Sequence, residues 1–514
     1  MVDHGGASPP TFARRVRSFG ERPAVIDPSG SSTYAELDRR SADLAHVLLA
    51  AAEAADLGGA RVVLLCRPGV EFVTALLACW RAGGLAVPLH PDHPLTELEG
   101  LATDAQPVLV VTSGVHAELG RAVAASVGAH TVELPTGLPA DHHAAGAGAP
   151  PTVLPDVGDD RPALMVFTSG TTGRPKGAVH THASVRAQVE AMVAAWGWSP
   201  SDRIVLVLPL HHVHGIVNVT LCPLWVGATC EAPGRFDATA TWERFASGDV
   251  TVFMAVPTVY ARLAAAWDAA DEATRRRWSE GAARLRLMVS GSAALPVAVL
   301  DRWQHITGHV LLERYGMTEV GMALGNTLDA RVPGHVGVPF PGVEVRLVDE
   351  AGADVPDGQP GELLLRGPQL FAGYWNRDDA TADAFVDGWF RTGDVAVRTP
   401  EGFRLLGRAS VDILKTGGEK VSALEVEEVY RTHPAVADCA VVGLPDEEWG
   451  DRVAMAVVAR PGSVPEASEL RAWGRQRLAP AKVPVRYLVV DELPRNAMGK
   501  VVKPDVRALF PPEA

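Results

Sequence analysis

Apolar and polar positions follow one another along the first part of the chain in a pattern typical of layered α/β proteins. Short runs rich in valine, isoleucine and leucine at residues 61–66, 107–112, 203–208 and 250–256 predict buried strands. Alanine-rich stretches of helical character separate these runs, and strands that alternate with helices form parallel sheets covered by helices. Residues 136–162 are rich in alanine, glycine, proline and aspartate without periodicity, which predicts an exposed connection.

Toward the C-terminus the pattern changes twice. Short alternating strands at residues 343–348 and 362–365 predict a small antiparallel β subdomain. The string Ser-Ala-Leu-Glu that begins at Ser422 then predicts a capping box and the start of a helix in a separate C-terminal part. We therefore expect an α/β fold with a large N-terminal domain over residues 1–407 and a small α+β domain over residues 408–514.

Composition and charge narrow the possible classes of protein. The chain has 514 residues, more than one hydrophobic core usually supports, and its 47% hydrophobic and 21% charged residues are ordinary for a globular protein. A net charge of −14 disfavours nonspecific binding to nucleic acid or to an anionic membrane. We find no signal peptide and no membrane span, and five cysteines without a CxxC pair fit a reduced compartment. We therefore expect a cytoplasmic protein.

A hydroxyl- and glycine-rich loop follows the apolar run at residues 163–167. It reads Thr-Ser-Gly-Thr-Thr-Gly-Arg-Pro-Lys-Gly from Thr168 to Gly177. Such loops offer backbone N–H groups and hydroxyls to phosphate oxygens, and their glycines allow close approach of the backbone. The spacing differs from that of a Walker A loop, and a glycine-rich turn alone could be purely structural. The full string, however, resembles the signature loop of the adenylate-forming superfamily, which comprises acyl-CoA synthetases, peptide-synthetase adenylation domains and luciferases.

Further motifs of this superfamily occur in its usual order, at residues 313–319, 388–394 and 494–500. The resemblance covers about residues 15–510. It implies an adenylate-forming fold and an enzyme that uses ATP, Mg²⁺ and coenzyme A to convert a carboxylic acid into a thioester through an acyl adenylate, releasing AMP and pyrophosphate.

The same resemblance implies roles for individual residues. Lys500 would screen the approach of the substrate carboxylate to the α-phosphate, since two anions repel unless cations stand between them. Glu319 would hold Mg²⁺, a hard cation that takes oxygen ligands, and Thr318 would bind the phosphates. Tyr315 would stack on adenine, and Asp394 would accept hydrogen bonds from the ribose. The other ATP-binding residues implied are Thr168, Ser169, Gly170, Thr171, Thr172, Gly173, Lys176, Gly316 and Arg408.

The resemblance also implies that the C-terminal domain rotates between the two half-reactions. Ser410 stands at the hinge position, where Asp or Lys is usual, and Gly417 and Gly418 would then face coenzyme A. Glu419 stands where an aromatic or small polar residue is expected. Both departures affect the expected domain rotation and not the chemistry, because neither residue contacts the reacting atoms in the mechanism.

Within the superfamily, the strings at residues 208–215, 312–315 and 494–500 are most similar to malonyl-CoA synthetases. Arg314 precedes the tyrosine at a position where many relatives carry an uncharged residue. An arginine in a closed acyl pocket is costly unless an anion pairs with it, and the second carboxylate of a dicarboxylic acid could do so with bidentate geometry. The alternative is that Arg314 points away and pairs with Glu313 or another acid.

The resemblance implies three more residues at the binding site for the substrate acid. His212 or His214 would line or close the pocket, and Ser292 would lie near the substrate carboxylate; otherwise Ser292 only caps the following helix. The histidines lack the nearby cysteine or acidic ligands that a metal site needs. Malonate and methylmalonate stay open, because one methyl group changes pocket fit by only about 1 to 3 kcal/mol.

Three other functions compete. A medium-chain or aryl acid–CoA ligase would leave Arg314 unused and would show a tunnel lined only by apolar side chains beyond His212. A stand-alone adenylation module would charge a carrier protein, but the chain contains no obvious carrier sequence. A regulator that binds nucleotide and has lost catalysis is disfavoured because four residues are all present: Glu319, Asp394, Arg408 and Lys500. The sequence indicates no oligomeric state.

Overall fold

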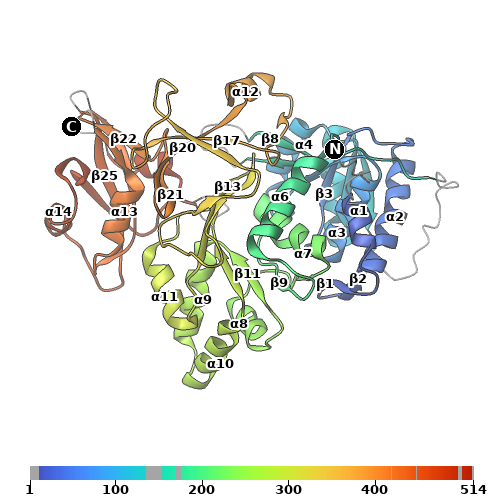
Figure 1. Ribbon diagram of the computed structural model, residues 1–514, viewed down its shortest axis with the longest axis horizontal. Helices are drawn as coiled ribbons and strands as arrows, with labels where there is room; N and C mark the ends of the chain where they lie inside the picture. The colour runs from blue at the N-terminus through green and yellow to red at the C-terminus, as the bar shows by residue number, and fades with distance from the viewer. Residues whose placement is uncertain are drawn as a thin grey trace, which may run out of the picture.

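The computed structural model describes residues 11–134, 153–168, 175–417, 419–446, 449–495 and 500–511. The chain folds into a large N-terminal domain built on three sheets and a small C-terminal domain built on a fourth (Figure 1). A large mixed α/β domain with a small C-terminal domain is the fold expected from the sequence. In the described part of the chain, no helix combines the length and apolarity needed to cross a bilayer.

The first sheet carries the base of the phosphate loop. Its strands, in spatial order, are β18 (Gly373–Tyr374), β8 (Gly177–Thr181), β7 (Pro162–Phe167), β4 (Leu85–Pro88), β3 (Arg61–Leu65), β5 (Leu109–Ser113) and β6 (His130–Leu134). The predicted strands at residues 61–66 and 107–112 are thus confirmed as β3 and β5, and they pair in parallel. Residues 153–161, the described end of the predicted connection, contain neither helix nor strand.

The second sheet has nine strands and carries the residues proposed for the acid. In spatial order they are β15 (Val338–Pro339), β14 (Gly321–Gly325), β13 (Leu312–Met317), β12 (Leu287–Ser290), β11 (Val252–Ala255), β9 (Arg203–Val205), β10 (Thr229–Glu231), β1 (Pro23–Asp27) and β2 (Gly30–Thr33). Strands β9 to β13 pair in parallel, as the alternation of strands and helices predicts. β9 ends at Val205, three residues before the predicted apolar run does.

Helices cover these two sheets. They are α1 (Phe12–Arg17), α2 (Tyr34–Ala51), α3 (Val70–Arg81), α4 (Leu95–Ala105), η1 (Gly114–His116), α5 (Ala117–Val127), α6 (His182–Trp196), η2 (His214–Leu221), α7 (Cys222–Val226), α8 (Ala238–Ala246), α9 (Pro257–Ala269), α10 (Glu272–Ala283) and α11 (Val297–Thr307). Helix α3 is buried over nearly its whole length, which explains why its sequence is apolar all round rather than amphipathic. Trp242 of α8 stacks on Trp278 of α10 and on Trp303 of α11, and this aromatic cluster joins the three helices.

The predicted antiparallel subdomain is confirmed as the third sheet. Its strands are β16 (Glu344–Val348), β17 (Gly361–Arg366), β20 (Trp389–Thr399), β19 (Phe385–Val386) and β21 (Gly402–Arg408), with the short helix α12 (Asp378–Asp383) beside them. β20 is the central strand, so the segment that contains Asp394 is held by neighbours on both sides.

The C-terminal domain lies at one end of the molecule, next to β21 (Figure 1). It consists of β22 (Ile413–Thr416), β23 (Glu419–Ser422), α13 (Ala423–Arg431), β24 (Val436–Asp446), β25 (Gly450–Ala459), α14 (Ala467–Arg475), η3 (Pro480–Lys482), β26 (Arg486–Val490) and α15 (Lys503–Ala508).

The capping box predicted at Ser422 is only half right. The Ser422 hydroxyl accepts the Glu425 N–H at 3.2 Å, but the Glu425 carboxylate accepts hydrogen bonds from Lys482 instead of returning to the backbone.

Polar contacts from α13, β22 and β23 reach the N-terminal domain in this arrangement. The carboxylate of Glu428 on α13 accepts the N–H of Val297 at 3.0 Å and so caps α11, which has no side-chain cap of its own. Glu350, between β16 and β17, lies 3.0 Å from Lys420 and 3.5 Å from Lys415. These contacts hold α13, β22 and β23 against the N-terminal domain in this arrangement.

Candidate active site

The parallel strands β12 and β13 bring two of the predicted acid-binding residues together. Ser292 follows the carboxyl end of β12 and Arg314 lies on β13, and the Arg314 Nη2 donates to the Ser292 Oγ at 3.2 Å. Such strand ends are where open α/β sheets bind ligands. Ser292 has a φ of 69°, in the left-handed region that a serine seldom adopts. Helix α11 begins at Val297 with Pro296 at its N-cap and no side-chain cap, so the alternative role of Ser292 as a helix cap is wrong.

Arg314 is a buried cation. The residue is 4% exposed, its Nε has no hydrogen-bond partner among the described residues, and burial lowers the pKa of its guanidinium to about 9. The neighbouring Glu313 lies on the other side of the strand and accepts the Gly334 N–H at 2.8 Å. No carboxylate among the described residues forms an ion pair with Arg314, so the pairing with Glu313 that the sequence left open does not occur there. A buried charge of this kind favours an anionic ligand.

His214, the first residue of the π-helix η2, joins Arg314 and Ser292 as the third member of this group. The His214 Nδ1 lies 3.2 Å from the Ser292 Oγ, so one hydroxyl contacts both the imidazole and the Arg314 guanidinium. His214 is buried and its Nε2 has no partner within the described residues. Burial first, and then the charge of Arg314, hold the pKa of His214 well below its ordinary value. The imidazole is therefore neutral and can accept or donate a hydrogen bond.

His212 lies at one end of a group of imidazoles. Its ring centroid is 3.9 Å from that of His211, which in turn contacts His90 at 4.8 Å and His93 at 5.1 Å. Burial, followed by the charge of Lys500, lowers the pKa of His212 to about 4. His90 and His93 were not predicted, although the string His-Pro-Asp-His, one residue after the end of β4, was a signal that could have been noticed.

Two residues that the sequence predicts for ATP binding face each other across one strand pair of the third sheet. Asp394 on β20 faces Arg408 on β21, and the Arg408 Nε lies 3.3 Å from the Asp394 Oδ1. The Tyr315 hydroxyl donates to the Asp394 Oδ2 at 2.5 Å. Asp394 is 7% exposed, and burial raises its pKa while Arg408 opposes that rise. Strand pairing therefore holds a buried carboxylate next to an aromatic ring and an arginine.

Lys500 reaches the same place from the C-terminal domain. Burial is the main reason that the pKa of Lys500 falls to about 8; Arg408 and Arg314 lower it further and Asp394 raises it. The Lys500 ammonium is therefore near enough to Arg314, Asp394 and Arg408 for their charges to act on it, although these residues are far apart in the sequence.

Glu319 and the base of the phosphate loop are linked through Tyr374. Ser169, Gly170, Thr171, Thr172 and Gly173 lie outside the described residues. The Thr168 N–H donates to the Lys176 carbonyl at 2.9 Å and closes the loop. Glu319 is 6% exposed, and its Oε1 accepts the hydroxyl of Tyr374 at 2.7 Å. His180 donates to the carbonyl of Thr318 at 2.7 Å.

Magnesium would fit at Glu319. Burial raises the pKa of this carboxyl, and no lysine or arginine in the described ranges forms an ion pair with it. One protein carboxylate together with substrate phosphates is a usual ligand set for Mg²⁺. At Gly316, a Cβ atom would lie 2.0 Å from the Gly321 carbonyl oxygen, so only glycine lets the chain turn toward Glu319.

The hinge and coenzyme A candidates lie apart from these groups. Ser410 is exposed in the turn between β21 and β22, where the Arg408 carbonyl accepts the Asp412 N–H at 2.8 Å. Gly417 has a φ of 57° and donates its N–H to the Trp449 carbonyl at 2.9 Å. Gly418 lies outside the described residues. In this arrangement the structure therefore does not bring Ser410 and Gly417 to the Arg314 group.

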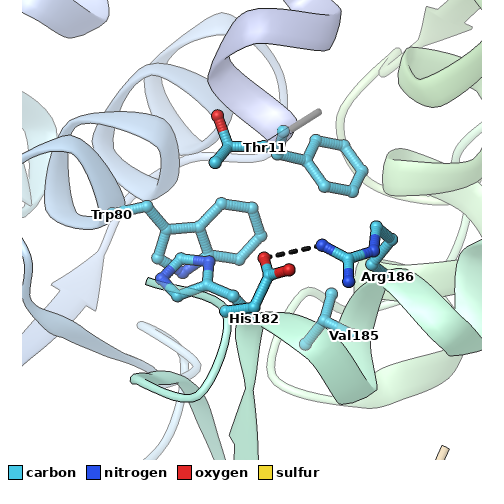
Figure 2. A pocket seen from close by; sticks show the side chains of 7 residues that line it. Thr11, Trp80, His182, Val185 and Arg186 are labelled. Atoms are coloured by element: carbon cyan, nitrogen blue, oxygen red, sulfur yellow. Dashed lines mark hydrogen bonds and ion pairs between the residues drawn. The ribbon is translucent and has the colours of Figure 1, made fainter. Parts of the chain in front are cut away.

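A small cavity next to α6 is unrelated to the site. Figure 2 shows it between Thr11, Trp80 and His182, with Arg186 donating to Asp159 at 2.6 Å. Its volume is about 10 Å³, which is at most the space of one water molecule. It shares no lining residue with the candidate site and is too small for an acid or a nucleotide.

Comparison with known proteins places the chain in a family. Residues 12–375 match the AMP-binding enzyme family, and residues 425–500 match the AMP-binding enzyme C-terminal domain. The chain is 46% identical to the mitochondrial malonate–CoA ligase ACSF3 of Mus musculus, over 99% of this chain and 92% of that protein. Two solved structures are also similar. ATP-bound MatB from Rhodopseudomonas palustris has a TM-score of 0.86 at 34% identity, covering 96% of this chain and 98% of MatB.

The second solved structure is a malonyl-CoA ligase in a ternary product complex with methylmalonyl-CoA and AMP. It has a TM-score of 0.66 at 38% identity and covers 93% of this chain and 98% of that one. The family match spans more than half of the chain, and the resemblance extends through both domains. The chain therefore belongs to the AMP-binding enzyme family, as an AMP-forming CoA ligase of the malonyl-CoA synthetase type.

Proposed function

We propose that this enzyme joins malonate to coenzyme A through a malonyl adenylate, with ATP converted to AMP and pyrophosphate. The observation that carries the choice of acid is Arg314, a buried guanidinium that hydrogen bonds to Ser292 and has no carboxylate partner among the described residues. The second carboxylate of malonate supplies that partner, whereas an uncharged acyl chain leaves the cation desolvated and unpaired.

The surroundings of His212 favour a short acid over a medium-chain or aryl one. The side chains that continue from His212 are the imidazoles of His211, His90 and His93, which do not form the purely apolar tunnel that a long acyl chain needs. Methylmalonate differs from malonate by one methyl group, worth about 1 to 3 kcal/mol in a pocket. We therefore propose methylmalonate as a second, weaker substrate.

In the adenylation step, an oxygen of the reacting carboxylate attacks the α-phosphorus of ATP and pyrophosphate leaves. Lys500 neutralises charge between the two anions, and the loop from Thr168 to Lys176 holds the phosphates together with Thr318. Asp394 and Arg408 orient the ribose. Glu319 would hold Mg²⁺, whose contribution is to neutralise phosphate charge.

In the second step, the sulfur of coenzyme A attacks the acyl carbon and AMP leaves. The domains, with a boundary between residues 407 and 408, rotate about Ser410 so that Lys500 withdraws and Gly417 and Gly418 face the thiol. Two comparisons support such a rotation. The chain matches the ATP-bound relative with a TM-score of 0.86 but the thioester product complex with only 0.66, as expected if the domains are arranged differently in the two steps. The position of Lys500 beside Arg314 and Asp394 belongs with the ATP-bound arrangement.

Product analysis tests the proposal. With malonate, MgATP and coenzyme A, we expect equal amounts of malonyl-CoA, AMP and pyrophosphate by chromatography and mass spectrometry. ADP and inorganic phosphate as products would contradict adenylate chemistry. An adenylate without any coenzyme A thioester would instead favour a module that charges a carrier protein.

The pH dependence of adenylation follows from Lys500. Because the pKa of Lys500 is about 8 rather than its ordinary 10.5, the charged form prevails below pH 8 and is lost as the pH rises through that value. We expect kcat/KM for malonate-dependent ATP–pyrophosphate exchange to fall above about pH 8. The Lys500→Arg variant stays charged, so its fall should shift upward to about pH 9, where the Arg314 guanidinium loses its charge. An unshifted fall near pH 8 in this variant would assign that fall to another group.

The cytoplasmic location expected from the sequence stays a prediction. The name of the mouse relative places that protein in mitochondria. Fractionation of the cells that produce this chain, followed by immunodetection, distinguishes the two compartments.

A further inference from the structure

One side chain that the sequence did not indicate contacts both halves of the phosphate-binding region. The Tyr374 hydroxyl donates to the Glu319 Oε1 at 2.7 Å, and the Lys176 Nζ lies 4.9 Å from the centre of the Tyr374 ring. Glu319 is the residue proposed for Mg²⁺, and Lys176 is the cation at the end of the phosphate loop. A carboxylate and an ammonium from distant parts of the chain thus share one tyrosine.

Backbone pairing fixes the place of this tyrosine on both sides. β18 pairs with β8, so that Tyr374 faces Ala178, and the Trp375 N–H donates to the Gly177 carbonyl at 2.8 Å. Three residues earlier, the Phe371 N–H donates to the Glu319 carbonyl, also at 2.8 Å. The short segment around Tyr374 therefore connects the strand that leaves the phosphate loop to the turn that carries Glu319.

We propose that Tyr374 is a positioning residue that sets the distance and orientation between Glu319 and Lys176 for binding the magnesium complex of ATP. The hydroxyl directs one oxygen of the Glu319 carboxylate, leaving the other oxygen for a cation, because a hydrogen bond to a charged acceptor is directional and strong. The ring face attracts the Lys176 ammonium by its quadrupole. This inference rests on the proposed ATP-dependent reaction and adds a residue to it.

The two contacts of Tyr374 can be separated by substitution. In Tyr374→Phe the ring stays against Phe371, at 4.8 Å between centroids, and under Lys176, while only the hydrogen bond to Glu319 is lost. The backbone N–H of residue 374 donates to the Thr381 hydroxyl at 2.9 Å whatever the side chain. The fold should therefore survive this change. Tyr374→Leu removes the ring as well and with it the support of Lys176.

Calorimetric binding of a non-hydrolysable ATP analogue, with and without Mg²⁺, tests the inference without relying on activity. For the wild-type enzyme we expect Mg²⁺ to strengthen binding. In Tyr374→Phe this gain should shrink about tenfold while the affinity without Mg²⁺ stays unchanged. Tyr374→Leu should in addition weaken binding without Mg²⁺.

A matched control is Tyr487→Phe, which removes a half-buried hydroxyl that lies 2.9 Å from the Tyr430 hydroxyl in the C-terminal domain. This variant should behave as wild type. An unchanged Mg²⁺ gain in Tyr374→Phe overturns the positioning role, and so does an equal loss of affinity with and without Mg²⁺, since that result indicates general damage. Failure of the wild-type enzyme to bind the analogue at all counts against the ATP-dependent reaction itself.

A kinetic measurement gives a second readout. In Tyr374→Phe, the Mg²⁺ concentration for half-maximal ATP–pyrophosphate exchange should rise several-fold, and the KM for malonate should stay the same. A rise in the KM for malonate with no change in the Mg²⁺ requirement would contradict the inference.

Discussion

Replacing Arg314 with leucine should remove most of the activity toward malonate. Truncating one partner of a buried, hydrogen-bonded charge pair costs about 2 to 5 kcal/mol, so kcat/KM for malonate should fall by about thirtyfold to several thousandfold. Activity toward acetate or butyrate, which have no second carboxylate, should be retained or should rise. The measurement is the steady-state rate of AMP release with each acid.

Two further variants make this prediction sharper. Arg314→Lys keeps the charge but loses the planar fork that binds a carboxylate through two hydrogen bonds, so its rate should lie between those of wild type and Arg314→Leu. Arg302→Leu, at a half-buried position of α11 where the arginine pairs with Asp268, serves as a control and should leave the rates unchanged. If Arg314→Leu uses malonate as well as wild type does, Arg314 does not bind the second carboxylate.

Replacing Lys500 with alanine should separate the two half-reactions. Loss of one group that stabilises developing charge typically costs 10²- to 10³-fold in rate, so malonate-dependent ATP–pyrophosphate exchange should fall by about that factor. Transfer of the malonyl group from supplied malonyl adenylate to coenzyme A should continue at the wild-type rate, because Lys500 has withdrawn by then. Rapid-quench measurement of each half-reaction checks this.

The control for this variant is Lys482→Ala, which removes another lysine of the C-terminal domain, paired with Glu425 at 2.7 Å and remote in its contacts from the site. It should leave both half-reactions intact apart from a small loss of stability. An equal loss of both half-reactions in Lys500→Ala would argue against a role confined to adenylation and against rotation of the domain between the steps.

Much of the fold could be predicted because its signals are local. The apolar runs at residues 61–66 and 107–112 became β3 and β5, and the alternating strands after β15 became the third sheet. The capping box was only half right for a tertiary reason: Lys482 arrives from a distant segment and takes the Glu425 carboxylate. A three-residue spacing predicts a cap, but it carries no information about such a competitor.

The candidate site likewise contains residues that the sequence predicts and residues that it misses. Arg314, Asp394 and Lys500 were found because each lies in a recognisable motif, and the structure adds that the three lie together. His90 and Tyr374 were missed because their importance arises from contacts with His211 and Glu319, which strand order and loop packing create. Single-sequence patterns record spacing along the chain and not which loops meet.

The most direct test of the central claim is a competition among acids. The enzyme would be incubated with Mg²⁺, ATP, coenzyme A and equal amounts of malonate, methylmalonate, acetate and octanoate, and the thioesters would be identified by mass spectrometry. The buried guanidinium of Arg314 predicts malonyl-CoA as the main product, with methylmalonyl-CoA next. Acetyl-CoA or octanoyl-CoA as the main product would contradict the dicarboxylate site.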